Sequence, residues 1–495
     1  MMYVARLLVA AGLLLPMVPL AAQQPAPTAT IAPGDTVVLT LRDALLRAEP
    51  ASEQVNIGRR LVDRSRADKT VAWSPLLPQV TLTPNYTRVV ETPFRQFFSG
   101  GGGGGGGVDL GSDNPFTATT NWALGGNVTW TPIDFAAYSQ ISAASRGIDV
   151  AKLQLSSQQA YTILTAAAAY YNALLADQLL GIRIATLEQA ERTFKDIQLG
   201  YEVGTQSEFD ALRARVARDN QVPVVTEARA NRAIAFTQLK QLLDLPIERE
   251  LNLVTPIDEG AVPEVPDSVR QQLGVADTTP DNRNVVQQAE FGVQQAQAFY
   301  EASGRQWLPT VGGFLNYSKQ GYATGFWPSS GAWFDDFNVG FGLTWPLFTG
   351  GRILGQRRAA RADLEIAQQS FKLTLEQAAL DNVSVTSRLQ EAEDNAKATE
   401  SVVEQAERAY QIAELRFKEG LSTQTELQDV RIQLEAARAN RASAFRDLQV
   451  ARLRLALLPY LPIGTADPSI VNAGSATRQA TGSASSSITS AGSVR

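Results

Sequence analysis

The chain has 495 residues, with 44 Lys and Arg against 50 Asp and Glu, and a formal net charge of -6. It contains no cysteine, which excludes disulfides, thiolate nucleophiles and acylated cysteine anchors, and no histidine, which removes the usual imidazole base and metal ligand. The acidic balance and the scattered arginines argue against a nucleic-acid surface. We therefore expect no catalytic residues, no metal, no cofactor and no nucleic-acid partner.

The first 22 residues predict a secretory signal peptide. Arg6 precedes an apolar stretch over residues 7–20, and small residues follow before Gln23. A membrane-spanning helix is the alternative, but the run is short and contains Pro16 and Pro19. No later segment offers the roughly 20 uninterrupted apolar residues that a spanning helix needs. If the exported protein enters a membrane, it does so through strands.

The exported part of the sequence repeats itself. The pentapeptide at residues 188–192 recurs letter for letter at 404–408, and the hexapeptide at 228–233 recurs at 437–442. The offsets are 216 and 209 residues, so the first copy carries seven extra residues between the motifs. Seven residues are two turns of a supercoiled helix, so the insertion preserves the face on which later side chains lie. A duplicated unit built on long helical hairpins is predicted.

The repeat divides the chain into five predicted regions. They are a signal peptide (1–22), a first repeat (23–245), an irregular proline-containing connector (246–280), a second repeat (281–462) and a disordered tail rich in small residues (463–495). Each repeat is predicted to hold one helix, two strands and a long helical hairpin.

Two strands are predicted in each repeat, because apolar and small or polar residues alternate there. The apolar faces hold Val80, Leu82, Pro84 and Tyr86; Trp122, Leu124, Gly126, Val128 and Trp130; Val311, Gly313, Leu315 and Tyr317; and Phe337, Val339, Phe341, Leu343 and Trp345. The pattern is typical of a membrane β-barrel with a wet lumen. A soluble β-sandwich is the alternative.

The position of the tryptophans favours the membrane. All seven lie in the predicted strands, in the loops between them or just before them. Amphipathic rings at strand ends suit membrane interfaces, and we assign Trp122, Trp130, Phe337 and Trp345 to that role. Since closed membrane barrels start at about eight strands, several chains have to contribute to one pore. The eight-glycine run at residues 100–107 is expected in an external loop.

Two long helices are predicted over residues 135–199 and 351–419. In both, apolar residues recur at spacings of four and three, which indicates coiled-coil packing, and only Arg183 interrupts the first seam. At 1.5 Å per residue each helix extends roughly 90 to 100 Å. Gly204 and Gly420 end the two seams at equivalent places, which predicts the tips of two helical hairpins.

The segment from Leu343 to Arg352, Leu-Thr-Trp-Pro-Leu-Phe-Thr-Gly-Gly-Arg, resembles the strand-to-helix junction of the outer-membrane efflux protein family, the TolC-like channel-tunnels. Proline ends the strand by withholding a donor, and the glycines permit the turn into the helix. The resemblance covers about residues 39–459. It implies an α+β membrane protein with four transmembrane strands per chain. Three chains would share a 12-stranded barrel that continues into a long helical barrel in the periplasm.

The resemblance also implies two functional regions. The hairpin tips, which in the family contact periplasmic adaptor proteins, correspond to Tyr201, Gly204, Thr205, Phe417, Gly420, Leu421 and Ser422. Glu426 and Asp429, with Asp210 in the first copy, correspond to acidic rings at the periplasmic constriction. The alternative for these acids is a solvated helix face. Relatives often latch the tip with a tyrosine and an arginine, where this chain has Phe417 and Ser422; Arg416 or Lys418 could substitute.

The function implied is that of a passive exit channel for efflux or type I secretion, in the outer membrane of a Gram-negative bacterium with a large periplasmic portion. The expected partners are two further copies of the chain, outer-membrane lipid, a periplasmic adaptor (membrane fusion) protein and an inner-membrane pump of the RND, ABC or MFS type. A periplasmic coiled-coil structural or adaptor protein without a pore is the alternative. An enzyme on a helical scaffold is less consistent with the composition, because no catalytic motif stands out.

Overall fold

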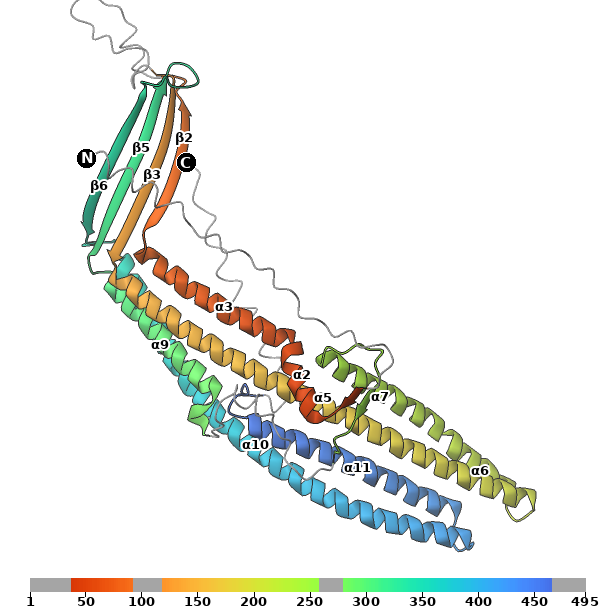
Figure 1. Cartoon of the computed structure of the whole chain (residues 1–495). Helices are drawn as coiled ribbons and strands as arrows, with labels where there is room; N and C mark the ends of the chain where they lie inside the picture. The colour runs from red at the N-terminus through yellow and green to blue at the C-terminus, as the bar shows by residue number, and fades with distance from the viewer. Residues whose placement is uncertain (1–36, 92–117, 258–278, 465–495) are drawn as a thin grey trace, which may run out of the picture.

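The computed structural model describes residues 37–91, 118–257 and 279–464. The predicted signal peptide, the eight-glycine run, most of the connector and nearly all of the predicted tail lie outside these residues. The described chain is elongated and gently bent, with a four-stranded sheet at one end and two helical hairpins at the other (Figure 1). Among the described residues, no helix combines the length and the apolar character needed to cross a membrane.

The sheet contains all four predicted strands in one antiparallel array. The strands are β2 (Gln79–Arg88), β3 (Thr120–Ile133), β5 (Thr310–Ala323) and β6 (Trp333–Thr344), in the order β2-β3-β5-β6. β6 begins four residues earlier than the predicted start at Phe337, because Asp335 and Asp336 obscure the alternation in the sequence. β2 and β6 are the two edges, and neither has a second partner within the described chain.

Four helices continue the sheet in the same order. They are α3 (Glu53–Trp73), α5 (Phe135–Glu202), α9 (Asn284–Arg305) and α10 (Arg352–Lys418), and each packs against the next. Farther from the sheet, α5 packs against α6 (Glu208–Asp219) and α7 (Gln221–Leu242), while α10 packs against α11 (Gln424–Leu457), which also contacts α5. Figure 1 shows these layers side by side along the long axis. The edge helices of the layer, α3 and α10, therefore lie on the same sides of the chain as the edge strands of the sheet, β2 and β6.

Local signals explain where the long helices begin and end. Asp134 caps α5 by accepting hydrogen bonds from the backbone N–H groups of Ala136 and Ala137. α10 follows Gly350 and Gly351, both of which have positive φ. The predicted bounds of both helices agree with the structure to within three residues.

The return helix of the first hairpin is broken, whereas that of the second is continuous. α6 ends at Asp219 and α7 begins at Gln221, and Pro223 lies in the first turn of α7. Proline has no N–H for the carbonyl four residues earlier, which weakens the helix at that point. The break lies within the segment where the first copy is seven residues longer than the second.

The main apolar core lies at the middle of the long axis. α2 (Leu41–Ala51) and the parallel pair β1 (Val37–Leu39) and β4 (Leu251–Leu253) pack there against α5, α7 and the end of α11. Tyr170 of α5 is fully buried in this core, and its hydroxyl donates to the backbone carbonyl of Leu39 at 3.0 Å. Two short 3₁₀ turns, η1 (Ser74–Leu76) and η2 (Pro280–Asn282), complete the described elements.

A buried ion pair fixes the start of the second half. The side chain of Arg283, which follows η2, is fully buried, and its Nη2 lies 2.9 Å from Oδ2 of Asp381 on α10. The guanidinium also donates to the backbone carbonyls of Ala378 and Leu461. Because these partners satisfy most of its donors, the charge is tolerated in the interior.

Candidate functional site

One face of the sheet is almost entirely apolar. The observed register places the four predicted apolar faces on the same side, since Tyr86 pairs with Trp122 and Tyr317 pairs with Phe337. The opposite side carries mostly Thr, Asn, Ser and Gly residues, with Phe314, Tyr322 and Phe334 among them. Most of the apolar side chains are exposed in the single chain. A sheet with one apolar and one mainly polar face is suited to separate lipid from water.

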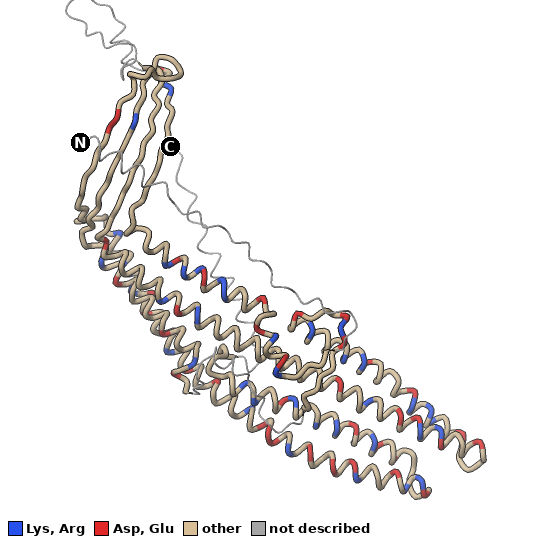
Figure 2. The backbone as a smooth tube through the Cα atoms, viewed as in Figure 1, with Lys and Arg blue, Asp and Glu red and all other residues tan. Residues whose placement is uncertain are grey.

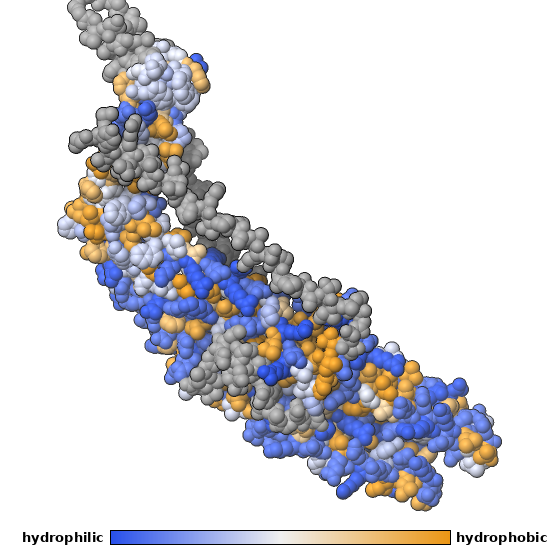
Figure 3. Space-filling model, in the orientation of Figure 1, coloured by the Kyte–Doolittle hydropathy of each residue, from blue (hydrophilic) through white to orange (hydrophobic). Residues whose placement is uncertain are grey.

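Charged residues are confined to one end of the sheet. The only charged side chains in the four strands are Arg88, Lys319, Asp335 and Asp336, and all lie within five residues of the strand ends that point away from the helices. Figure 2 shows the rest of the sheet free of red and blue, in contrast to the helices. The visible surface of the helices is mostly hydrophilic (Figure 3).

Aromatic side chains form two belts on the apolar face. The distal belt, far from the helices, contains Tyr86, Trp122, Phe326, Trp327 and Trp333. The proximal belt contains Trp130 and Trp345, whose indole N–H groups donate to the carbonyls of Leu76 and Trp307. Trp122 and Trp130 are eight residues apart in β3, which corresponds to about 26 Å at 3.3 Å per residue.

The structure places three of the four predicted interface aromatics in these belts. Trp122 lies in the distal belt, and Trp130 and Trp345 lie in the proximal belt. Phe337 instead lies in the interior of β6, four residues from Trp333 at the distal end. Trp333 was not predicted for this role, because the strand was expected to begin at Phe337.

Both hairpin tips turn through a glycine in the left-handed region. Gly204 has φ 79° and Gly420 has φ 71°, where other residues are strained. In the first tip, the N–H groups of Thr205 and Gln206 both donate to the carbonyl of Gly200. In the second, the N–H of Leu421 donates to the carbonyl of Arg416. The predicted tips are therefore turns with closed hydrogen-bond patterns.

Two of the three predicted gate acids have a structural role at the start of a return helix. Asp210 accepts a hydrogen bond from the hydroxyl of Ser207, which in turn caps α6. Glu426 occupies the equivalent position in α11, which Thr423 caps. A carboxylate in the first turn is stabilised by the helix dipole. The hydrogen bond from Ser207 explains the acid at Asp210, and the helix dipole favours an acid at Glu426.

The electrostatic surroundings of the second-hairpin acids differ. Oε1 of Glu426 lies 3.5 Å from Nη1 of Arg416, so this carboxylate is partly neutralised across the turn. Asp429 is exposed and makes no ion pair or hydrogen bond with any described residue. Lys418 pairs with Glu414 within α10. Among the predicted gate acids, Asp429 is the one that capping and pairing leave unexplained.

The two hairpins contact each other near their tips. Phe417 of the second hairpin packs against the cluster of Ile197, Ala211 and Ala214 in the first. The predicted adaptor contact Phe417 is thus half-buried between the hairpins, and the hydroxyl of Ser422 is buried without a hydrogen-bond partner among the described residues. The exposed apolar residues of the tips are Tyr201, Val203, Phe209 and Leu421. Val203 lies within the first predicted tip, between Tyr201 and Gly204, whereas Phe209 was not singled out from the sequence.

A polar cavity of about 600 Å³ separates the hairpins behind these contacts. It is lined by Arg192, Asp196, Tyr410, Glu414 and Lys418, among others. Burial raises the pKa of the Tyr410 hydroxyl, and the nearby Glu414 carboxylate raises it further. Burial lowers the pKa of the neighbouring Arg431 guanidinium, whose Nε has no hydrogen-bond partner among the described residues. The hairpin interface therefore contains a partly buried phenol and a partly buried guanidinium.

The sequence does not explain why a charged residue, Arg183, interrupts the coiled-coil seam. In the structure, Arg183 forms an ion pair with Glu435 of α11, whose side chain is buried. The pair joins the first hairpin to the second.

No group of three or more acidic side chains that could hold a metal ion occurs among the described residues.

The outer edge of α10 carries an uncovered apolar stripe. Ile366, Leu373 and Leu380 follow each other at seven-residue spacing, and each is more than half exposed. Seven-residue spacing keeps side chains in line along a supercoiled helix. The principal neighbours of α10 within the chain are α9 and α11, and neither covers the stripe, whose residues stay exposed.

Comparisons with known proteins agree with this arrangement. The model of the outer membrane efflux protein family matches residues 48–244 and 276–458. Nodulation protein T of Rhizobium leguminosarum bv. viciae is 22% identical over 366 residues, which are 70% of this chain and 71% of that protein.

Solved structures share the fold. The CmeC outer membrane channel of Campylobacter jejuni has a TM-score of 0.68 at 15% identity and covers 88% of each chain. The outer membrane protein VceC of Vibrio cholerae has a TM-score of 0.67 at 17% identity and covers 85% of this chain and 96% of its own. The MtrE outer membrane channel of Neisseria gonorrhoeae has a TM-score of 0.65 at 18% identity and covers 84% and 88%.

Proposed function

Because this chain belongs to the outer membrane efflux protein family, we propose that three copies of it form an exit channel through the outer membrane of a Gram-negative bacterium. In this arrangement the two halves of each chain are copies of one unit, with the boundaries that the sequence predicts. The strands of the three copies close one 12-stranded barrel, and the helices extend it as a periplasmic tunnel. The duct is passive and catalyses no reaction.

The uncovered edges of the chain carry this proposal. In a membrane no water satisfies the backbone groups of β2 and β6, so both edges need a strand partner. The four strands alternate in direction, so β6 of one copy would pair antiparallel with β2 of the next. A head-to-tail contact of this kind closes into a ring. Four strands are too few to close alone, since membrane barrels start at about eight.

The helical layer supports the same closure. α3 and α10 lie at its two edges, directly beyond β2 and β6. The apolar stripe of α10 faces away from the chain's own helices, and α3 exposes Ile57, Leu61 and Val71. We infer that α10 of one copy packs against α3 of the next.

The height of the apolar band fits a membrane. The two aromatic belts are about 26 Å apart along β3, and the apolar band of outer-membrane barrels is about 25 Å tall. Amphipathic rings stabilise a barrel at both interfaces. The distal belt would face the outside of the cell, and the proximal belt the periplasm.

The hairpin tips would meet a periplasmic adaptor protein. Tyr201, Val203, Phe209 and Leu421 expose apolar surface at the end farthest from the sheet. We propose that these side chains, with the backbone of Gly204, Thr205 and Gly420, bind the adaptor and through it an inner-membrane pump. Phe417 and Ser422 would act between the hairpins.

Cross-linking tests the assembly. Leu61 lies 12 residues from the sheet end of α3, and Ile366 lies 14 residues from the sheet end of α10, so the two positions are at a similar height. Because the chain has no cysteine, a Leu61→Cys/Ile366→Cys variant carries only the intended thiols. A short thiol-reactive linker should join the chains into covalent trimers in isolated outer membranes.

Each single variant, Leu61→Cys or Ile366→Cys, is the matched control and should give no trimer. If the double variant stays monomeric while the protein fractionates with soluble periplasmic material, the pore is rejected in favour of a periplasmic coiled-coil protein.

The gate has its own experiment. We propose that Asp429 supplies a ring of three carboxylates at the periplasmic constriction, with a smaller contribution from Glu426 because Arg416 partly neutralises it. A ring of like charges in a narrow pore attracts cations. Asp429→Asn should lower cation selectivity in planar bilayers and relieve block by trivalent cations. Glu426→Gln, which keeps a capping side chain, should have a smaller effect.

Asp210→Asn is the matched control, since it removes a tip carboxylate that its own helix cap engages. Asp429→Asn trimers with the selectivity and block of the wild type would return Asp429 to a solvated helix face.

A further inference from the structure

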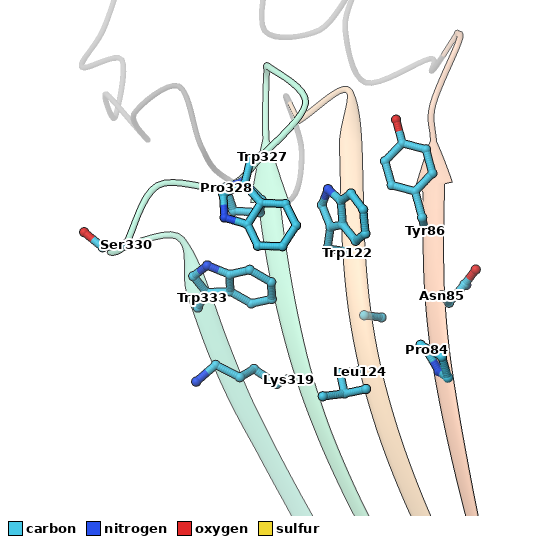
Figure 4. A pocket seen from close by; sticks show the side chains of 11 residues that line it. Pro84, Asn85, Tyr86, Trp122, Leu124, Lys319, Trp327, Pro328, Ser330 and Trp333 are labelled. Carbon is cyan, nitrogen blue, oxygen red and sulfur yellow. The ribbon is translucent and has the colours of Figure 1, made fainter.

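A cavity of about 950 Å³ opens on the apolar face of the sheet at its distal end. It spans all four strands of one chain: Tyr86 of β2, Trp122 of β3, Lys319 of β5 and Trp333 of β6 all line it (Figure 4). Trp327 and Pro328, from the turn between β5 and β6, close it at the end away from the helices. The cavity therefore does not depend on a neighbouring copy.

The walls of the cavity are aromatic rings held in place by mutual contacts. The ring centroid of Trp122 lies 4.6 Å from that of Tyr86 and 4.9 Å from that of Trp327, and Trp327 lies 5.9 Å from Trp333. Trp122 Nε1 donates to the carbonyl of Phe326 at 2.7 Å, which fixes the turn above the strands. The rings thus form an aromatic wall of fixed geometry, and their flat faces suit sugar rings and acyl chains.

The cavity offers hydrogen-bond donors beside the side chains of Asn85, Tyr86 and Ser330, which can both donate and accept. Lys319 points to the cavity, and its ammonium lies 3.5 Å from Oδ1 of Asp335, which also accepts from the hydroxyl of Tyr317. One of three ammonium protons suffices for Asp335. The indole N–H groups of Trp327 and Trp333, which can only donate, make no hydrogen bond with a described residue.

A second cation lies beside the cavity. Arg88 ends β2 on the same face as Tyr86, two residues farther from the helices, and makes no ion pair with a described residue. Two cationic side chains and the free indole N–H groups favour an anionic ligand, since the one carboxylate here, Asp335, is already paired. The face that carries the cavity continues directly into the apolar band through Leu124 and Leu82. A ligand with an anionic, sugar-like head and apolar chains would match both parts.

We propose that this cavity binds a phosphorylated, multiply acylated saccharide lipid of the outer leaflet, with one site per chain. The inference rests on the proposed membrane orientation of the sheet. The sugar rings lie against Trp122, Trp327 and Trp333, a phosphate accepts a hydrogen bond from Lys319, and Arg88 attracts the anionic head from the edge strand. The acyl chains extend along Leu124 and Leu82 toward the proximal belt. Asp335 positions the ammonium of Lys319 and does not contact the phosphate.

Native mass spectrometry of the purified full-length protein in detergent tests the site, with lipid A, a bis-phosphorylated and acylated glucosamine disaccharide, as the probe. We expect up to three lipid A molecules per trimer, and at least tenfold weaker binding for Lys319→Gln and for Trp327→Ala. Dephosphorylated lipid A should also bind at least tenfold more weakly. Trp345→Ala, which removes an exposed ring from the other belt, is the matched control and should bind lipid A as the wild type does.

Three outcomes would overturn the site. The first is equal binding of lipid A by the wild type, Lys319→Gln and Trp327→Ala. The second is equal binding of phosphatidylethanolamine, which would indicate only general lipid contact. The third is equal binding of the deacylated phosphosaccharide, which would assign the cavity to a soluble ligand. The same spectra report the number of chains, so a trimer without specific lipid A binding refutes this site and leaves the channel standing.

Discussion

The two long helices, α5 and α10, have nearly equal lengths of 68 and 67 residues but opposite surroundings. α5 packs against helices on both sides and buries a long series of alanines together with Tyr170 and Tyr171. α10 packs mainly against α9 and α11 and buries few of its side chains, while its apolar stripe stays exposed. The difference places α5 inside the helical layer of the chain and α10 at its edge, where the proposed contact with another copy would form.

The largest effect is expected at that edge. Leu373→Glu/Leu380→Glu places two charges in the apolar stripe, where burial against a neighbouring helix would be costly. We expect loss of the trimer while the helical content of the chain is kept, measured by size-exclusion chromatography with light scattering and by circular dichroism.

Gln368→Glu/Ala379→Glu adds the same two charges on exposed positions away from the stripe, and this control should still assemble. Equal loss of assembly in both variants would mean that charge itself, and not the stripe, decides the result.

Within α5 the expected effect is on folding of the chain. Tyr170→Ala removes a fully buried ring and should lower the free energy of unfolding by about 3–5 kcal/mol. Tyr170→Phe keeps the ring but removes the hydroxyl that donates to the carbonyl of Leu39 and accepts from the N–H of Thr255, which should cost about 1 kcal/mol. Denaturant unfolding followed by circular dichroism measures both, and similar costs for the two would contradict the packing described for α5.

A smaller effect is expected where the two hairpins join. Glu435→Ala leaves Arg183 without its partner, and because Arg183 is partly exposed we expect a cost of about 1–3 kcal/mol. Arg183→Leu/Glu435→Leu should recover most of it by continuing the apolar seam. A double variant as unstable as the single one would show that the pair is not the source of the cost.

The smallest effect concerns pH at the hairpin tips. The pKa of Tyr410 is raised in the folded chain, so the unfolded chain loses this proton first as the pH rises. The stability that protonated Tyr410 adds to the folded chain is present below the usual tyrosine pKa of about 10 and is lost as the pH rises above it. The tips should therefore loosen at strongly alkaline pH in the wild type, measured by proteolysis near Gly204 and Gly420. The tips of Tyr410→Phe should not loosen at alkaline pH. If they still do, the loosening comes from another ionisable group.

Patterns with a local cause could be predicted from the sequence. Alternation with period two predicted all four strands, and the glycines at 204 and 420 predicted the turns, because both depend on neighbouring residues alone. The start of β6 was missed since Asp335 and Asp336 interrupt the alternation. Asp335 pairs with Lys319 on the adjacent strand, and Asp336 accepts from the side-chain amide of Asn338; the sequence reveals neither contact.

Contacts between the two halves could not be predicted. Glu435 opposite Arg183 and Phe417 against Ile197 depend on how one hairpin is aligned with the other, and no local pattern fixes that alignment. The cavity beneath Trp327 likewise requires four strands in register. The sequence therefore predicted the elements and their order, while the pairing of charges and the shape of the cavity required the three-dimensional arrangement.

The number of chains in the detergent-solubilised protein tests the account most directly, because the environment of α10, the open strand edges and the pore all depend on it. Native mass spectrometry of protein extracted from outer membranes should give a mass equal to three processed chains. A stable species with the mass of one chain, with all four strands intact, would contradict the inference that the edges of this chain are closed by its own copies.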